Sequence, residues 1–229
     1  MSKVFQHYQS FLRATEQAAI AAAHLRGCGD GKMADKAATE AMRSVLNQEP
    51  VHTRVVIGEG ERDDAPMLFI GEELGDTTSD MKIDIAVDPL ECTNHCAHDL
   101  PDAISVLAAA PKGSLMGAPD TYMNKLCGSK ALKGHVSLTQ SVSENLSATA
   151  QALNKDIHDL QVIVLDRDRH QDLIADIQSA GANTVLIKDG DVAGGLRAVE
   201  GEVRLILNNY VDFGVADGAS FVKYTSLSA

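Results

Sequence analysis

The 229-residue sequence has 45% hydrophobic and 23% charged residues, the balance of an ordinary soluble globular protein with a sizeable core. Its formal charge of −12 argues against a nucleic-acid-binding surface, which needs a basic footprint. No run reaches membrane-spanning length and no secretory leader pattern is present, so we expect a soluble, cytoplasmic protein without membrane or nucleic-acid partners. The four cysteines form no C-x-x-C pair, and free thiols in a reducing compartment are the expected state.

Helical and strand-like patterns alternate along the first part of the chain. Apolar residues that recur at helical spacing predict helices, and short continuous apolar runs predict buried strands. Ser143 is the expected N-cap of a helix that ends near Leu153. The elements expected before Ser143 are helices over 4–25 and 33–46, strands over 54–57, 83–87 and 103–110, a helical turn over 66–70, and strands and turns over 113–127.

The pattern changes near Asp159, where strands and helices begin to alternate regularly. We expect strands over 160–166, from Asn183 onward and over 203–207, with helices ending at Gly181 and covering 192–199. Such alternation predicts parallel strand pairing. The fold class is therefore α/β, with a layered domain over 1–158 and an incomplete α/β unit over 159–229. The last twenty or so residues are polar and aperiodic, so we expect loose packing there.

An acid-rich turn, GEGERDD, follows the strand expected over 54–57. Its glycines permit a backbone path that could turn several carboxylates toward a common point. A solvated acidic loop, which is common in so acidic a protein, would have the same sequence. The carboxylates of this turn are those of Glu59, Glu61, Asp63 and Asp64.

A second acid-rich turn follows the strand expected over 83–87, in the segment IDIAVDPLECTN. Asp88 ends the strand, Pro89 forces a turn, and Glu91 and Thr93 follow at the start of a helix whose free amides suit a phosphate. The alternative is a plain strand–turn–helix in which Asp88 only caps. Oxygen-only ligands at strand ends favour Mg²⁺ or Mn²⁺, and such a site beside a hydroxyl is typical of phosphate chemistry.

Three further candidate groups lie elsewhere in the chain. Asp35 heads the second expected helix, where an acid is also favoured simply by the helix dipole. Arg167, Arg169 and Lys188 follow strands, and ligands bind at the carboxyl ends of strands in open α/β sheets. These residues could hold a second phosphate, although exposed loop charges have the same pattern. Tyr122 is either a core residue or a ligand contact, and the pattern does not decide between them.

Five blocks resemble, in order and spacing, the class II fructose-1,6-bisphosphatases of bacteria, some of which also act on sedoheptulose 1,7-bisphosphate. The blocks are GKMADKAATEAMR, VVIGEGERDDAPMLFIGEELG, IDIAVDPLE, APDTYMNKL and DGDVA. The second acid turn is also similar to that of the wider sugar and inositol phosphatase superfamily. The resemblance covers residues 5–196 and implies a layered α–β sandwich, Mn²⁺ or Mg²⁺ dependence, and hydrolysis of the 1-phosphate of fructose 1,6-bisphosphate.

The resemblance also implies roles for individual residues. Asp35, Glu59, Asp88 and Glu91 match the family's metal ligands. Glu61, Asp63 and Thr93 match catalytic positions, with the Thr93 hydroxyl assisting the attacking water. The substrate-contacting positions matched are Glu91, Cys92, Thr93, Tyr122, Arg167, Asp168, Arg169, Asp189, Gly190 and Asp191.

The chain departs from the family pattern at three places. Cys92 stands where the family has Gly, so we expect obstruction of a phosphate or backbone strain there. Asp168 replaces a proline and adds a negative charge near a presumed phosphate site. After Leu196 the resemblance fades, and the family's later glycine-rich block, with a further metal-ligating Glu, is not found.

These observations predict a sugar-bisphosphate phosphatase of gluconeogenesis whose partner is a small molecule. The alternative is a catalytically impaired member of the family that acts at most as a binding protein. A nucleotide-binding module over 160–191 is a weaker reading, because no G-x-G-x-x-G or Walker-type loop is present. An open sheet edge in the second domain would favour self-association into a homo-oligomer.

Overall fold

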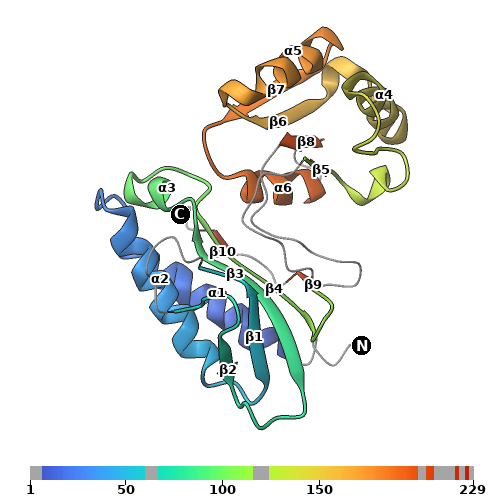
Figure 1. The fold of residues 1–229 in the computed structure, drawn as a ribbon. Helices are drawn as coiled ribbons and strands as arrows, with labels where there is room; N and C mark the ends of the chain where they lie inside the picture. The colour runs from blue at the N-terminus through green and yellow to red at the C-terminus, as the bar shows by residue number, and fades with distance from the viewer. Residues whose placement is uncertain are drawn as a thin grey trace. The chain divides into compact units, whose positions relative to one another are not determined.

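The computed structural model describes residues 7–59, 67–115 and 124–200, together with the backbone of three short strands nearer the C-terminus. The chain forms two compact units (Figure 1). Unit 1 comprises Met1–Asp120 and Asp212–Ala229, and unit 2 comprises Thr121–Val211. The units thus divide at Asp120 rather than near residue 158, because strand β5 pairs inside unit 2 with a strand that lies about eighty residues later.

A mixed six-stranded sheet forms the centre of unit 1. Its order is β10-β4-β3-β1-β2, and β9 also pairs with β4. Strands β1 and β3 are parallel, whereas the other pairs are antiparallel. The strands are β1 (His52–Ile57), β2 (Glu73–Gly75), β3 (Lys82–Glu91), β4 (Ile104–Pro111), β9 (Ser220–Phe221) and β10 (Thr225–Ser226).

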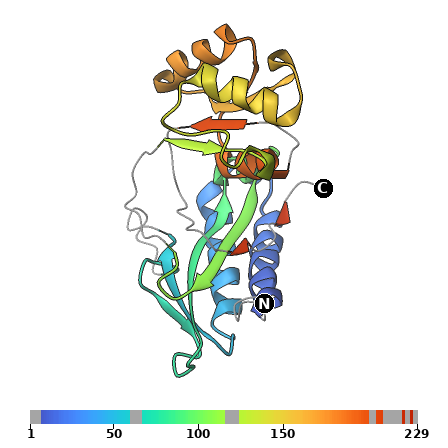
Figure 2. The same ribbon diagram turned by 90° about the vertical axis from the view of Figure 1, so that its right-hand side faces the viewer.

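Two helices, α1 (Tyr8–Ala23) and α2 (Gly31–Leu46), lie side by side along the sheet of unit 1 (Figure 1 and Figure 2). Both are rich in alanine on their buried sides, which lets the two helix backbones approach each other closely. They share one hydrophobic cluster with alternate residues of β3, such as Ile83, Ile85 and Val87. Because neighbouring strand residues point to opposite faces, this alternation defines the face of β3 that the helices cover.

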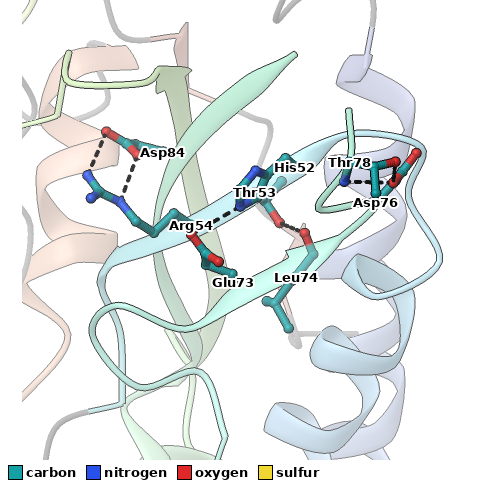
Figure 3. Close-up of polar contacts among 8 residues, drawn as sticks. All are labelled: His52, Thr53, Arg54, Glu73, Leu74, Asp76, Thr78 and Asp84. Atoms are coloured by element: carbon teal, nitrogen blue, oxygen red, sulfur yellow. Dashed lines mark hydrogen bonds and ion pairs between the residues drawn. The ribbon is translucent and has the colours of Figure 1, made fainter. Parts of the chain in front are cut away.

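Polar contacts join β2 to β1 and β1 to β3 (Figure 3). The Thr53 hydroxyl donates to the Leu74 carbonyl at 3.2 Å, and His52 Nε2 lies 3.2 Å from a Glu73 carboxylate oxygen. On the other side of β1, Arg54 reaches the buried Asp84 carboxylate of β3 at 3.3 Å. These contacts hold a three-residue strand that the apolar pattern alone did not predict.

Unit 2 is a four-stranded sheet of order β5-β8-β6-β7 with helices on both faces. Val162 and Val164 of β6 pack against α4 and α5, whereas Ile163 packs against α6. A strand with apolar residues on both faces is typical of a parallel sheet covered on both sides. The main elements are β5 (Lys125–Cys127), α4 (Val142–Leu153), β6 (Gln161–Leu165), α5 (Gln171–Ser179), β7 (Asn183–Ile187), α6 (Asp191–Glu200) and β8 (Leu205–Asn208).

The α/β class expected from the sequence is confirmed, with two differences of detail. Ser141, not Ser143, caps α4, because its hydroxyl accepts from the Glu144 amide while the Glu144 carboxylate accepts from the Ser141 amide. The segment over 67–70 is bend and turn rather than helix, and Leu68 there has a φ of 55°. In the described ranges, no helix combines the length and apolar character needed to cross a membrane.

Candidate functional site

The carboxyl ends of the parallel strands β1 and β3 bring two predicted metal ligands to the same end of the sheet. Ile57 pairs with Ala86 in the register of these strands. Glu59 and Asp88 each lie two residues beyond that pair, and both are partly exposed. The first acid turn follows β1 as expected. The expectation that Asp88 ends the strand and that Pro89 forces a turn is wrong, because β3 continues through both residues to Glu91.

A bulge in β3 determines where Glu91 points relative to Asp88. Asp88 pairs with Val106 and Glu91 with Ile104, so three steps along β3 match only two along β4. Residues three apart on a regular strand face opposite sides, but the extra bulged residue returns Glu91 to the side of Asp88. The bulge holds Pro89, which lacks the amide hydrogen of a regular strand pair.

The turn after β3 has an unusual backbone at Cys92. This residue has φ 68° and ψ 55°, the left-handed conformation, and is buried. Its Sγ lies 3.8 Å from a Glu91 carboxylate oxygen. The strain expected where a cysteine replaces the family's glycine is thus confirmed.

Thr93 begins α3 (Thr93–Ala97), a helix of only five residues. The short helix leaves little dipole with which to attract an anion, so the expected phosphate-binding helix start is weaker than the sequence suggested. Burial raises the pKa of the thiol of Cys96 in the same helix. Cys96 packs in the hydrophobic cluster of unit 1.

The start of α2 packs directly against α3. The Asp30 carboxylate caps α2 by accepting from the Met33 amide at 3.1 Å. A Cβ placed on Gly31 would contact Thr93 at 3.4 Å. Asp35 lies one helical turn beyond Gly31 and therefore on the same side of α2. The helix thus brings a fourth carboxylate toward the Thr93 end of β3.

The donor set at this end of unit 1 is chemically suited to a hard divalent cation, because it consists of carboxylates. Asp88 also accepts from the Leu90 amide at 3.0 Å through Oδ1, which orients its carboxylate within the bulge. Among the described side chains, no three of the four predicted ligands (Asp35, Glu59, Asp88 and Glu91) place ligand atoms within 4.8 Å of one another. The backbone therefore places the four residues toward one end of the sheet, but their carboxylate oxygens do not converge on one position. Their role as ligands stays a prediction.

Several predicted residues lie outside the described part of the chain. These are Glu61, Asp63 and Asp64 of the first acid turn and the substrate-contact candidate Tyr122. Their predicted roles are carried by the motif alone.

The arginine loop of unit 2 follows β6. The Arg167 guanidinium donates to the Asp166 carbonyl at 3.1 Å and to the Lys188 carbonyl at 2.5 Å. It therefore ties the loop after β6 to the loop after β7. Asp168 and Arg169 are exposed on the 3₁₀ turn that follows. The structure thus brings the RDRH and KDGD segments together, as expected for loops at the carboxyl ends of adjacent parallel strands.

The loop after β7 enters α6 through Asp189, Gly190 and Asp191. Gly190 has a φ of 86°, and its amide donates to the Asp189 carboxylate at 3.1 Å. Asp191 is buried and forms an ion pair with Lys125 of β5 at 2.5 Å. A partner from β5 was not predicted, because Lys125 and Asp191 are 66 positions apart.

Sequence reasoning also missed an ion pair between a half-exposed arginine of α2 and a buried glutamate. Arg43 of α2 contacts Glu72 at 2.6 Å between Nε and Oε1. Glu72 lies in the GEELG part of the motif that contains Glu59. The sequence shows that this residue is acidic, but it does not show that Arg43 is its partner.

Comparison of the sequence with known proteins identifies the family of this chain. The sequence matches the family model described as bacterial fructose-1,6-bisphosphatase, glpX-encoded, over residues 6–209. Curated relatives named D-fructose 1,6-bisphosphatase class 2/sedoheptulose 1,7-bisphosphatase include one from Thermosynechococcus vestitus, 49% identical over 196 residues, which are 81% of this chain and 56% of the relative. Another, from Synechocystis sp., is 48% identical over 193 residues, which are 80% of this chain and 56% of the relative. The chain thus spans about half the length of these relatives.

Among solved structures, CysQ from Bacteroides thetaiotaomicron, a bacterial member of the inositol monophosphatase family, matches this chain. The match has a TM-score of 0.45 and 17% identity, and it covers 86% of this chain and 78% of that chain. The family match covers most of the 229 residues, including both strand ends of unit 1 and both loops of unit 2. The chain belongs to the family of glpX-encoded bacterial fructose-1,6-bisphosphatases.

Proposed function

We propose that this chain is a Mn²⁺- or Mg²⁺-dependent phosphatase that hydrolyses the 1-phosphate of fructose 1,6-bisphosphate, and that sedoheptulose 1,7-bisphosphate is a second substrate. The observation that carries the proposal is that Glu59 and Asp88 each lie two residues beyond the last parallel pair of β1 and β3, with Glu91 returned to the side of Asp88 by the bulge. Family membership supports the same chemistry.

Asp35, Glu59, Asp88 and Glu91 would hold the cation. A bound Mg²⁺ or Mn²⁺ would supply a Lewis acid for the phosphoryl oxygens and lower the pKa of water. The Thr93 hydroxyl, at the first position of α3, would orient the attacking water and pass on its proton. The Asp88–Leu90 hydrogen bond would keep the Asp88 carboxylate in place during the reaction.

The loops of unit 2 would contribute substrate contacts. Arg169 is exposed next to the fixed Arg167, and an arginine guanidinium matches the geometry of a phosphate. Asp189 and Gly190 would bind sugar hydroxyls or the phosphate through the turn before α6. The buried Lys125–Asp191 pair would hold that turn rather than contact the sugar.

The test is phosphate release from fructose 1,6-bisphosphate with and without Mn²⁺. We expect metal-dependent release that Glu59→Gln reduces by at least about a hundredfold, the size of effect typical for loss of a group that stabilises the transition state. Asp80→Asn is the control, because Asp80 is an exposed acid of unit 1 before β3. Equal activity in wild type and Glu59→Gln would refute the assignment of Glu59 as a ligand of the cation.

A second candidate is a non-catalytic member of the family that binds a sugar bisphosphate without turnover. It is favoured by the buried Cys92 side chain, which occupies a left-handed turn beside Glu91. This candidate predicts calorimetric binding of fructose 1,6-bisphosphate with no phosphate release. Ordinary turnover with Mn²⁺ would eliminate it.

A further inference from the structure

The segment that follows the first acid turn is attached to α2 by a half-buried ion pair. Arg43 Nε lies 2.6 Å from Glu72 Oε1. The second oxygen of the same carboxylate, Oε2, accepts from the Leu68 amide. One buried carboxylate therefore joins α2 to the backbone of Leu68.

Leu68 in turn contacts Gly58, the residue that follows β1. It is completely buried and has a φ of 55°. A Cβ on Gly58 would overlap the Leu68 carbonyl oxygen, so the two backbones are in close contact. Gly58 immediately precedes Glu59, and any movement of Leu68 would change the position at which the Glu59 backbone leaves β1.

Backbone hydrogen bonds hold Glu72 itself against β1. The Val55 amide donates to the Glu72 carbonyl at 2.9 Å, and the Gly71 amide donates to the Val55 carbonyl at 2.8 Å. These two bonds fix the position of Glu72 beside Val55 of β1. From this position its carboxylate reaches both Arg43 and Leu68.

We infer that Arg43 and Glu72 form a clamp that positions Glu59 for cation binding by locking Leu68 against Gly58. The inference rests on the proposed function, in which Glu59 is a ligand. Neither Arg43 nor Glu72 belongs to the proposed ligand set, so both are positioning residues. Outer partners of metal ligands commonly change metal affinity by about 10- to 100-fold when they are altered.

Glu72→Gln is the sharpest perturbation of the clamp. A carboxylate offers two acceptor oxygens, whereas an amide offers one acceptor and one donor. In the variant, either Arg43 or the Leu68 amide must therefore face an NH₂ group. The volume of the side chain hardly changes, so the effect is confined to the hydrogen bonds and the charge.

Unit 1 contains a closely matched control. The Asp84 carboxylate of β3 also accepts from one arginine and one backbone amide. The arginine is Arg54, at 3.3 and 3.5 Å (Figure 3), and the amide is that of Gly113, at 2.5 Å. The carboxylate side chains are 6% exposed at Glu72 and 1% at Asp84, and the arginines are 37% and 40% exposed. Asp84→Asn therefore imposes the same donor–donor conflict at a site four residues before Asp88, roughly 13 Å away along the strand.

The experiment measures Mn²⁺ affinity by isothermal titration calorimetry for wild type, Glu72→Gln and Asp84→Asn. We expect both variants to unfold at lower urea concentration, while only Glu72→Gln binds Mn²⁺ about tenfold or more weakly. Unchanged Mn²⁺ affinity in Glu72→Gln would overturn the inference, and so would an equal loss in Asp84→Asn. If Glu72→Gln does not fold, Arg43→Lys replaces it. That variant keeps the charge but loses the Nε contact, and it is expected to weaken Mn²⁺ binding to a smaller extent.

Amide hydrogen exchange separates failure of the clamp from failure of the proposed function. The clamp predicts faster exchange of the Leu68 amide in Glu72→Gln than in wild type or Asp84→Asn. If wild type binds no Mn²⁺, the proposed ligand set is wrong, and exchange alone then decides whether the clamp exists. Equal exchange at Leu68 in all three proteins would disprove the clamp.

Discussion

The backbone conformation at Cys92 predicts how the stabilities of a glycine and an alanine variant at this position should differ. Alanine normally stabilises a protein relative to glycine by about 0.4–1 kcal/mol, because it restricts the unfolded chain. At Cys92 the φ of 68° should reverse this order. We therefore expect Cys92→Gly to be more stable than Cys92→Ala.

The magnitude follows from two opposing terms. A residue with a Cβ costs roughly 1–2 kcal/mol in the left-handed conformation. Subtracting the unfolded-chain advantage of alanine, about 0.4–1 kcal/mol, leaves a net preference for glycine of about 1 kcal/mol. Both variants lose the same buried Sγ and its contact with Glu91, so this loss cancels in the comparison.

Urea denaturation of the two variants measures the difference, provided that the m-value is unchanged. The control is the same pair of substitutions at Glu40, an exposed position inside α2, where alanine should be favoured by about 1 kcal/mol. If Cys92→Ala equals or exceeds Cys92→Gly in stability, the left-handed turn after β3 is wrong. The mechanism proposed for Thr93 would then lose its structural basis.

Two further predictions concern other parts of the fold. Gly58→Ala should destabilise unit 1 by about 1–3 kcal/mol, because its Cβ would overlap the Leu68 carbonyl and force the backbone apart. The control is Gly195→Ala in α6, where an added Cβ has its nearest neighbour at 4.0 Å. This variant should be neutral or stabilising in the same denaturation assay. Ser141→Ala should destabilise α4 by about 1 kcal/mol at neutral pH through loss of the N-cap, as measured by thermal unfolding. The hydrogen bonds that the Ser141 hydroxyl and amide donate to the Glu144 carboxylate lower the pKa of Glu144. The part of the capping contribution that comes from this carboxylate is therefore complete above the ordinary pKa of a glutamate and is lost as the pH falls through the lowered value, whereas the bond from the Glu144 amide to the Ser141 hydroxyl remains. A Ser141→Ala effect that stays constant down to strongly acid pH would contradict this assignment.

The elements that sequence predicted well are those with long, continuous patterns. The helices α1 and α2 and the strands β3, β4 and β6 have enough apolar residues for their period to be clear. Strand β2 has only three residues, and its pairing depends on side-chain contacts with β1. The strands β9 and β10 pair with β4 across more than a hundred residues of sequence, a distance over which local patterns carry no information.

The site shows the same limit. The position of Glu59 just after β1 was predictable, because polar residues directly after an apolar run mark the end of a strand. The same pattern placed the end of β3 at Asp88, whereas the strand continues to Glu91. The side to which Glu91 points depends on the bulge at Pro89, which is a property of the pairing between β3 and β4. The partners of Glu72 and Asp191 lie 29 and 66 positions away, so their ion pairs could not be read from the sequence.

The central claim is that carboxylates at the ends of β1 and β3 bind a divalent cation. An electron paramagnetic resonance titration of Mn²⁺ with wild type and Asp88→Asn tests it most directly. Asparagine at position 88 keeps an oxygen that can accept from the Leu90 amide, so the turn should persist while one ligand charge is lost. We predict that wild-type protein removes the signal of free Mn²⁺ at micromolar concentration and that Asp88→Asn needs about tenfold or more protein to do so. Equal uptake by both proteins, or none by wild type, would contradict the claim.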